Sequence, residues 1–123
     1  MTTRRLLSRL ARVSLAAVFV HGGYRAATEP GDRTTKAARI GFPDDPRLVR
    51  ANGAAMVVGG TALALGILPR LAAAGLIASL VPSSAAGHPF WLDTDPAARA
   101  QNLNQTLKNL GLVGGLLLVA TER

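Results

Sequence analysis

The sequence predicts an all-α fold, a four-helix transmembrane bundle with short loops and one longer polar loop, residues 28–50, between the first two helices. The main observation is a pair of uncharged apolar runs, residues 51–69 and 71–87, separated only by Arg70. A helix rises about 1.5 Å per residue and a bilayer core is about 30 Å thick, so each run is just long enough to span a membrane. So short a connection makes the two spans antiparallel.

The composition is the second observation, and it supports one membrane domain over residues 1–123. Hydrophobic residues make up 49% of the chain and come in long blocks rich in Ala, Gly and Leu, whereas aromatic residues make up only 4%. Such small residues would build a thin core in water, but they let helices approach closely in lipid. Because the chain has no cysteine, disulfides, Cys-ligated metals and thiol nucleophiles within it are excluded.

The charge balance, +7 from 14 basic and 7 acidic residues, concerns the partners of the chain. Nucleic-acid binding is one interpretation of such a balance. The basic residues are concentrated at the N-terminus and in loop 28–50, however, and no nucleic-acid motif accompanies them. We therefore expect contact with anionic lipid head groups and no nucleic-acid partner.

The first helix is predicted over residues 5–24. A basic start followed by the apolar stretch 13–20 is also typical of a secretory signal peptide. Residues 21–25 make a poor cleavage site and long apolar spans follow, so a spanning helix is favoured. In the polar loop, residues 34–40 are predicted to form a short interfacial helix. Asp44 and Asp45, between two prolines, are most simply a solvated turn, with a cation site as the alternative.

The second and third helices are predicted over residues 51–68 and 71–88. Each carries a stripe of small residues at spacings of three and four, as close packing in lipid requires, although Ala and Gly are common here and some stripe is expected by chance. The stripes are Ala55, Gly59, Ala62 and Gly66, and Ala72, Gly75, Ser79, Pro82 and Ala86. Pro82 is expected to kink the third helix, with Ser83 and Ser84 helping to satisfy the freed carbonyls.

The fourth helix is predicted over residues 100–121, and only its second half is apolar. Its polar first half must face other helices, water or head groups. The pair Phe90-Trp91, at the end of the third span, fits an interfacial aromatic belt.

The parity of four spans places both termini on one side of the membrane and gathers scattered polar residues at the other. Embedded ionisable residues are costly and often functional. The candidate cofactor-binding residues are His21, Tyr24, Asn52, His88, Lys108 and Asn109. The histidines either cap helix ends or hydrogen-bond a quinone head group together with Lys108 or Tyr24. Haem ligation is a weaker alternative, because two histidines on two helices are a minimal signal. Metal ligation is also weaker, because carboxylate partners are lacking in the spans, and we expect no metal site.

The orientation of the chain depends on its basic residues. Arg4, Arg5, Arg9 and Arg12 favour a cytoplasmic N-terminus, and with it a cytoplasmic C-terminus. Counted over the whole chain, six basic residues fall on that side and eight on the other, which slightly opposes this orientation. No catalytic signature is present, so we do not expect the chain to be a catalyst by itself.

Four segments together resemble the DoxX family of small four-helix bacterial and archaeal membrane proteins. They are RVSLAAVFVHGG at 12–23, GGTALALGILPRLAA at 59–73, GHPFW at 87–91 and LKNLGLVGGLLL at 107–118. The resemblance covers residues 12–120. Many similar proteins carry an acidic residue where this chain has Met56, which argues against carrying over a proton-handling role.

The resemblance implies a multi-pass protein of the bacterial inner membrane. The family is named for a subunit associated with an archaeal terminal quinol oxidase and thiosulfate:quinone oxidoreductase. Some bacterial members are linked to membrane oxidoreductase assemblies that handle oxidative stress. The expected role is therefore an accessory or scaffolding subunit of such an assembly, with lipid and membrane proteins, or further copies of itself, as partners. Binding of a quinone or another lipophilic ligand is the alternative. A small-solute carrier is less favoured, because the chain shows no inverted repeat.

Overall fold

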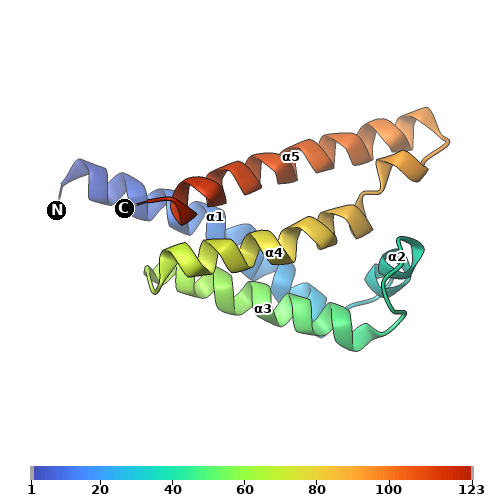
Figure 1. Cartoon of the computed structure of the whole chain (residues 1–123), viewed down its shortest axis with the longest axis horizontal. Helices are drawn as coiled ribbons and strands as arrows, with labels where there is room; N and C mark the ends of the chain where they lie inside the picture. The colour runs from blue at the N-terminus through green and yellow to red at the C-terminus, as the bar shows by residue number, and fades with distance from the viewer. Residues whose placement is uncertain (1, 123) are drawn as a thin grey trace.

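Four long helices and two short ones make up residues 2–122, the part of the chain that the computed structural model describes (Figure 1). Met1 and Arg123, the ends of the predicted domain, lie outside the described residues. The elements are α1 Thr3–Thr28, α2 Arg33–Arg39, α3 Pro46–Leu65, α4 Pro69–Gly87, the 3₁₀ helix η1 Phe90–Leu92 and α5 Pro96–Ala120. No strand occurs between residues 2 and 122, so the predicted all-α class is confirmed. The short helix predicted over 34–40 is also present, as α2.

The starts predicted for α3 and α5 were wrong by about one turn. Both helices begin with proline, Pro46 and Pro96, each preceded by an aspartate. Asp45 Oδ1 accepts a hydrogen bond from the Arg47 N–H at 2.9 Å, and Asp95 Oδ2 accepts one from Ala98 N–H at 3.3 Å. Proline fits the first helical position because its missing N–H would have no partner there. These Asp-Pro pairs are therefore helix starts, and the prediction that they belong to loops is wrong.

Asp45 was predicted to lie in a solvated turn, but it caps α3 and pairs with Arg47. Besides capping α3, its carboxylate binds the Arg47 guanidinium at 3.1 Å from Nε and 2.9 Å from Nη2. These hydrogen bonds with the side chain and then the backbone of Arg47 hold the pKa of Asp45 below its ordinary value. The carboxylate of Asp45 therefore has a cationic partner within the chain, the guanidinium of Arg47.

The turn between α3 and α4 comprises residues 66–68, whereas it was expected at residues 69–70. Gly66 adopts a left-handed conformation with φ of 73° and ends α3, and the Ile67 N–H returns to the Ala62 carbonyl at 2.8 Å. Leu68 also has a positive φ, 42°. Pro69 then occupies the first position of α4. The glycine thus supplies the conformation that other residues rarely adopt, and the proline starts the next helix.

Consecutive long helices pack as antiparallel neighbours: α1 on α3, α3 on α4, and α4 on α5. The start of α1 and the end of α5 lie at the same end of the molecule, as the parity argument predicts, and α2 lies at the other (Figure 1). Between α1 and α5 the contact is small and includes Leu15 and Gly115. The helices thus form an open array around a core of Ala16, Phe19, Met56, Leu63, Ala73, Leu76, Leu80, Leu116 and Val119.

Two helical segments are long and apolar enough to cross a membrane, α3 and Pro69–Leu92, when residues 2–122 are searched. Large apolar side chains point outward from both, such as Val58 (70% exposed) and Leu71 (68%). By the same criterion α1 and α5 are not assigned as spans. Their polar ends, the arginines of α1 and the amides of α5, account for the difference.

The tightest helix contact joins α1 to α3 at Gly23 and Gly53. A Cβ atom added to Gly23 would lie 2.6 Å from the Gly53 carbonyl oxygen, and one added to Gly53 would lie 2.6 Å from the Gly23 oxygen. Gly60 continues this seam, since its added Cβ would lie 2.9 Å from Val20 Cγ2. Backbone therefore meets backbone, an arrangement that is common in close helix pairs of membrane proteins.

The predicted stripes locate only part of this packing. Gly59 does face α4, where an added Cβ would lie 3.1 Å from Leu76 Cδ2. Ala55 is exposed, and an added Cβ at Gly75 would meet nothing within 4 Å. The α1–α3 seam uses Gly53 and Gly60 instead, a set rotated around the helix from the predicted stripe.

Adjacent glycines of α1 allow a matched test of this seam. Gly23→Ala should destabilise the protein by about 1–3 kcal/mol, because the methyl group would overlap the α3 backbone. Gly22→Ala should be neutral or slightly stabilising, because an added Cβ there meets nothing within 4 Å and alanine favours the helix. Thermal unfolding of both variants in one detergent measures the difference. Equal stability of the two would contradict the close contact.

Candidate functional site

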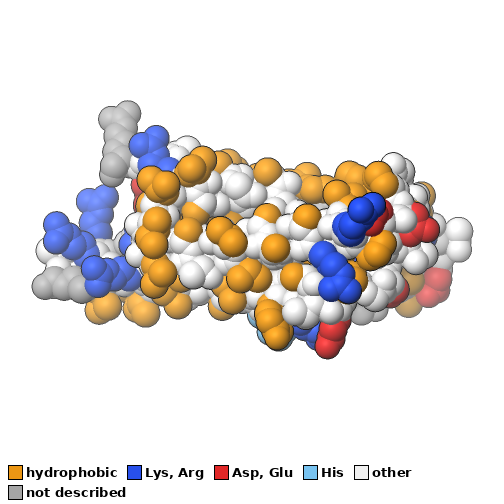
Figure 2. All heavy atoms as spheres, turned by 90° about the horizontal axis from the view of Figure 1, so that it is seen from below, with side chains coloured by type: hydrophobic (Ala, Val, Ile, Leu, Met, Phe, Trp, Pro, Cys, Tyr) orange, Lys and Arg blue, Asp and Glu red, His pale blue; other side chains and the backbone are white. Residues whose placement is uncertain are grey.

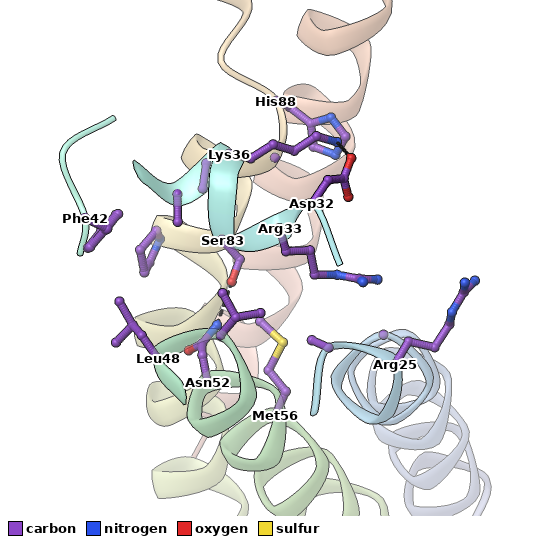
Figure 3. Close-up of a pocket in the computed structure, with 17 residues that line it drawn as sticks. Arg25, Asp32, Arg33, Lys36, Phe42, Leu48, Asn52, Met56, Ser83 and His88 are labelled. Atoms are coloured by element: carbon purple, nitrogen blue, oxygen red, sulfur yellow. Dashed lines mark hydrogen bonds and ion pairs between the residues drawn. The ribbon is translucent and has the colours of Figure 1, made fainter. Parts of the chain in front are cut away.

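A cavity of about 580 Å³ lies between the end of α1, the start of α3, the end of α4 and the short helix α2 (Figure 3). It is at the end of the molecule remote from the chain termini. Its lining comprises Gly22, Arg25, Ala26, Asp32, Arg33, Lys36, Ala37, Phe42, Leu48, Val49, Asn52, Met56, Pro82, Ser83, Ala86, Gly87 and His88. Apolar side chains supply much of the wall, and the polar groups come from four helices.

Helix α2 carries two of the three basic groups that line the cavity, Arg33 and Lys36, and the third is Arg25 of α1. Its buried residues Thr34 and Ala37 anchor the helix, which packs against α4 and α3. Arg33 donates a hydrogen bond to the Glu29 carbonyl at 2.9 Å, and Lys36 lies 3.7 Å from the Asp32 carboxylate. The packing of α2 therefore holds Arg33 and Lys36 over the opening between α1 and α4.

Asn52 and Ser83 join α3 to α4 at the opposite end of the cavity from Lys36 and Asp32 (Figure 3). Asn52 Nδ2 donates to Ser83 Oγ at 2.7 Å, and Ser83 Oγ donates to the Ser79 carbonyl, also at 2.7 Å. Pro82 removes the N–H that would bind the Ala78 carbonyl. Ser83 therefore bonds a carbonyl adjacent to the freed one, and Ser84 instead accepts a hydrogen bond from Asn109, which corrects the role predicted for both serines.

His88 has a fixed ring orientation, because a chain of hydrogen bonds runs from it to α5. Its Nδ1 lies 3.1 Å from Asn102 Oδ1, and Asn102 Nδ2 donates to Asp93 Oδ2 at 2.7 Å. An ionised carboxylate only accepts, so the Asn102 amide must turn its nitrogen to Asp93 and its oxygen to His88. That oxygen also only accepts. In the neutral ring the proton is therefore on Nδ1, and Nε2 is left as a hydrogen-bond acceptor.

The structure brings two of the six candidate residues, Asn52 and His88, to this cavity. His21 and Lys108 are exposed and do not line it, so the expected pocket between His21, His88 and Lys108 is not formed. Tyr24 is 63% exposed. For His21 the reason is helical phase: Phe19 and Gly23 face α3, and His21, two positions from each, lies on the far side of α1.

Asn109, the remaining candidate, links helices outside the cavity. Its Nδ2 donates to Ser84 Oγ at 2.8 Å, so it holds α5 against α4. A similar contact is made by Arg50, whose Nη1 donates to the Ala27 carbonyl at the end of α1 at 2.9 Å. Asn109 thus holds the middle of α5 against α4, and Arg50 holds the start of α3 against the end of α1.

The sequence argument did not select several polar residues in or next to the cavity, chiefly Arg33, Lys36, Asp93 and Asn102. The amides in the first half of α5 did signal a polar contact, but the sequence alone does not say which of them meets α4. For Arg33 and Lys36, no sequence pattern indicates a place in the cavity. They reach it because α2 folds back against α4 and α3, which are distant in the sequence. Among residues 2–122, no group of three metal-ligating side chains comes together, and the polar groups of the cavity are hydrogen-bonding groups.

The cavity combines two features that a lipophilic ligand with a polar head requires. Met56, Phe42 and Leu48 offer apolar contact, while His88 Nε2 accepts a hydrogen bond and Lys36 can donate one. Its cations, Arg25, Arg33 and Lys36, outnumber the single carboxylate of Asp32 among the lining residues. The head group favoured here is therefore neutral or electron-rich.

In the comparison with known proteins, the family model named DoxX matches residues 7–89 of the chain. No curated protein and no solved structure matches the chain. The matched range includes every residue that lines the cavity, and it ends before η1 and α5.

The hydrogen-bond chain to His88 makes a spectroscopic prediction. In ¹⁵N NMR of the neutral ring, Nδ1 should be protonated and Nε2 unprotonated. Asn102→Leu removes the acceptor and should shift the ring towards the Nε2–H tautomer. Asn109→Leu breaks a different α4–α5 hydrogen bond and should leave the tautomer unchanged. A dominant Nε2–H form in the unsubstituted protein would contradict the assigned orientation.

Proposed function

Because the chain belongs to the DoxX family of membrane proteins, we propose that it is a single-domain, multi-pass membrane protein that binds a quinone-like ligand in the cavity beneath α2. The observation that carries this proposal is the presence of an oriented histidine, His88, in an apolar-walled cavity of about 580 Å³. This volume lies within the roughly 300–1,000 Å³ typical of small-ligand sites.

Quinones make a specific demand on hydrogen bonding. The carbonyl oxygens of the oxidised form need donors, and the hydroxyl groups of the reduced form need acceptors as well. Lys36 Nζ is a donor, and His88 Nε2 is an acceptor when the ring carries its proton on Nδ1. Figure 3 shows these two side chains at one end of the cavity, with Met56 deeper between the helices. A flat ring with its polar edge towards His88 and its apolar body towards Met56 matches that arrangement.

The proposed topology has four spans, with α1 and α5 crossing beside the two apolar helices. In this topology both termini face the cytoplasm of a bacterial cell, and the cavity opens near the other surface. The cluster of arginines at the start of α1 supports this orientation. With 26 and 25 residues, α1 and α5 are long enough to cross with their polar ends in the head-group region.

Ligand binding can be tested by thermal unfolding of the purified protein with a short-chain quinone analogue. At a concentration 100-fold above Kd the ligand should stabilise the protein by about 2.7 kcal/mol, which raises Tm by several degrees. His88→Ala should abolish the rise. His21→Ala is the matched control and should retain it, because His21 is exposed and outside the cavity. An unchanged Tm at saturating analogue would reject the proposal.

A second candidate function, an accessory subunit of a membrane oxidoreductase assembly, is favoured by the outer face of α5. Polar and small residues are exposed there at helical spacing: Gln101, Asn104, Lys108 and Gly111. In lipid, amides and a lysine on one stripe are costly unless another protein segment binds them. The resemblance to the DoxX family suggests that this assembly is a membrane oxidoreductase.

Paired glycine variants test the accessory role. Gly111→Leu should markedly reduce the partner protein recovered when the tagged chain is purified from its native membrane, because the larger side chain holds the partner away. Gly75→Leu on α4 should leave recovery unchanged. An added Cβ meets nothing within 4 Å at either position, so both variants should fold. A chain that purifies as a monomer, or only with copies of itself, would contradict this role.

A further inference from the structure

A second, smaller hollow of about 310 Å³ lies on α1, at the end of the molecule remote from the cavity. Its lining consists of Arg5, Ser8, Arg9 and Arg12. These residues follow one another at spacings of three, one and three, which places them on one face of the helix. The hollow is therefore a pocket lined by three guanidinium groups and one hydroxyl.

The cations of this hollow lack protein partners for their charge. The ion pairs within residues 2–122 involve Arg25, Lys36 and Arg47, all towards the other end of the molecule. Arg12 Nε is buried without a hydrogen-bond partner, and Arg12 Nη1 makes a long hydrogen bond, 3.5 Å, to Ser8 Oγ. A buried, unpartnered guanidinium N–H is costly, so an acceptor from outside the chain is expected here.

The distribution of acidic residues strengthens the argument. Six of the seven acids belong to residues 29–45 and 93–95, and Glu122 alone follows α5 near the arginines. Figure 2 shows the same separation, with arginine side chains at the end that carries the termini and most of the visible acidic groups at the other. An anion approaching the arginine hollow thus meets little repulsion.

We propose that this hollow binds the phosphate group of an anionic phospholipid. Arginine presents a planar set of N–H donors that matches phosphate oxygens in pairs, and Ser8 offers a further hydroxyl donor. Arg12 lines the inner side of the hollow, while Arg5 and Arg9, which are exposed, close over the phosphate from the outer turns.

The surroundings of the hollow select a lipid over a free anion. On the same turns of α1, Leu6 is 50% exposed, Leu7 58% and Leu10 54%. The α3–α4 turn at this end adds Leu68, which is 68% exposed. An acyl chain can cover these side chains while its phosphate occupies the hollow, whereas inorganic phosphate cannot. Basic residues near a membrane surface each contribute about fivefold in affinity for anionic lipid.

The test uses the whole chain in a neutral detergent, with phosphatidylglycerol as the probe and binding followed by native mass spectrometry and by Tm. Phosphatidylglycerol should bind and raise Tm, and added salt should weaken binding. Phosphatidylcholine and inorganic phosphate at the same concentration should have little effect. Equal stabilisation by inorganic phosphate would overturn the assignment to a lipid, and equal binding of phosphatidylcholine would overturn the role of charge.

Substitutions distinguish the hollow from general attraction to a basic protein. The double variant Arg5→Gln, Arg9→Gln should lose about 25-fold in affinity for phosphatidylglycerol, at about fivefold per arginine. Its control, Arg39→Gln with Arg99→Gln, removes the same charge from exposed positions at the other end and should leave affinity within about twofold. Because all four side chains are exposed, both variants should fold. An equal loss in the two variants would refute a localised site.

Discussion

The backbone contact between Gly23 of α1 and Gly53 of α3 is the constraint on which the rest of the structure depends. It brings the end of one helix against the start of the next, with added Cβ atoms at 2.6 Å from the facing carbonyls. The chain between them, residues 29–45, must therefore leave and return at nearly the same place. It does so by folding α2 over the gap, where Thr34 and Ala37 are buried. The cavity results from this arrangement. The long helices α1, α3 and α4 form its floor, and the loop that contains α2 covers it.

Arginines stabilise the ends of these helices, which gives part of the +7 charge a structural role. The carbonyl end of a helix is partially negative and attracts cations. Arg50 binds the Ala27 carbonyl at the end of α1 at 2.9 Å, and Arg70 binds the Ala120 carbonyl at the end of α5 at 3.3 Å. In both cases the arginine comes from a different helix, so it also fixes how the helices align. Within residues 2–122, the guanidinium groups of Arg5 and Arg9 bind no helix-end carbonyl, so their charge does not contribute to helix alignment in this way.

Local patterns in the sequence were enough to predict the all-α class, the four long helices and the short α2. Helix starts were missed because Asp45-Pro46 and Asp95-Pro96 were assigned to loops, although this pair combines a capping side chain with the residue best suited to begin a helix. The site was harder to predict. Its composition depends on helix rotation: His88 reaches the cavity and His21 does not, although both are histidines near the same end of the molecule.

The rotation of α5 could not be predicted either, yet it decides the state of His88. Asn102, which orients the histidine, lies one position from Gln101 and two from Asn104, which belong to the exposed face proposed for docking. A rigid helix cannot move one of these faces without the other. If both proposed functions hold, a partner that shifts α5 would also alter the 3.1 Å contact between Asn102 and His88. Docking and ligand binding would then be linked through one hydrogen bond, with the cavity itself formed wholly by residues before η1.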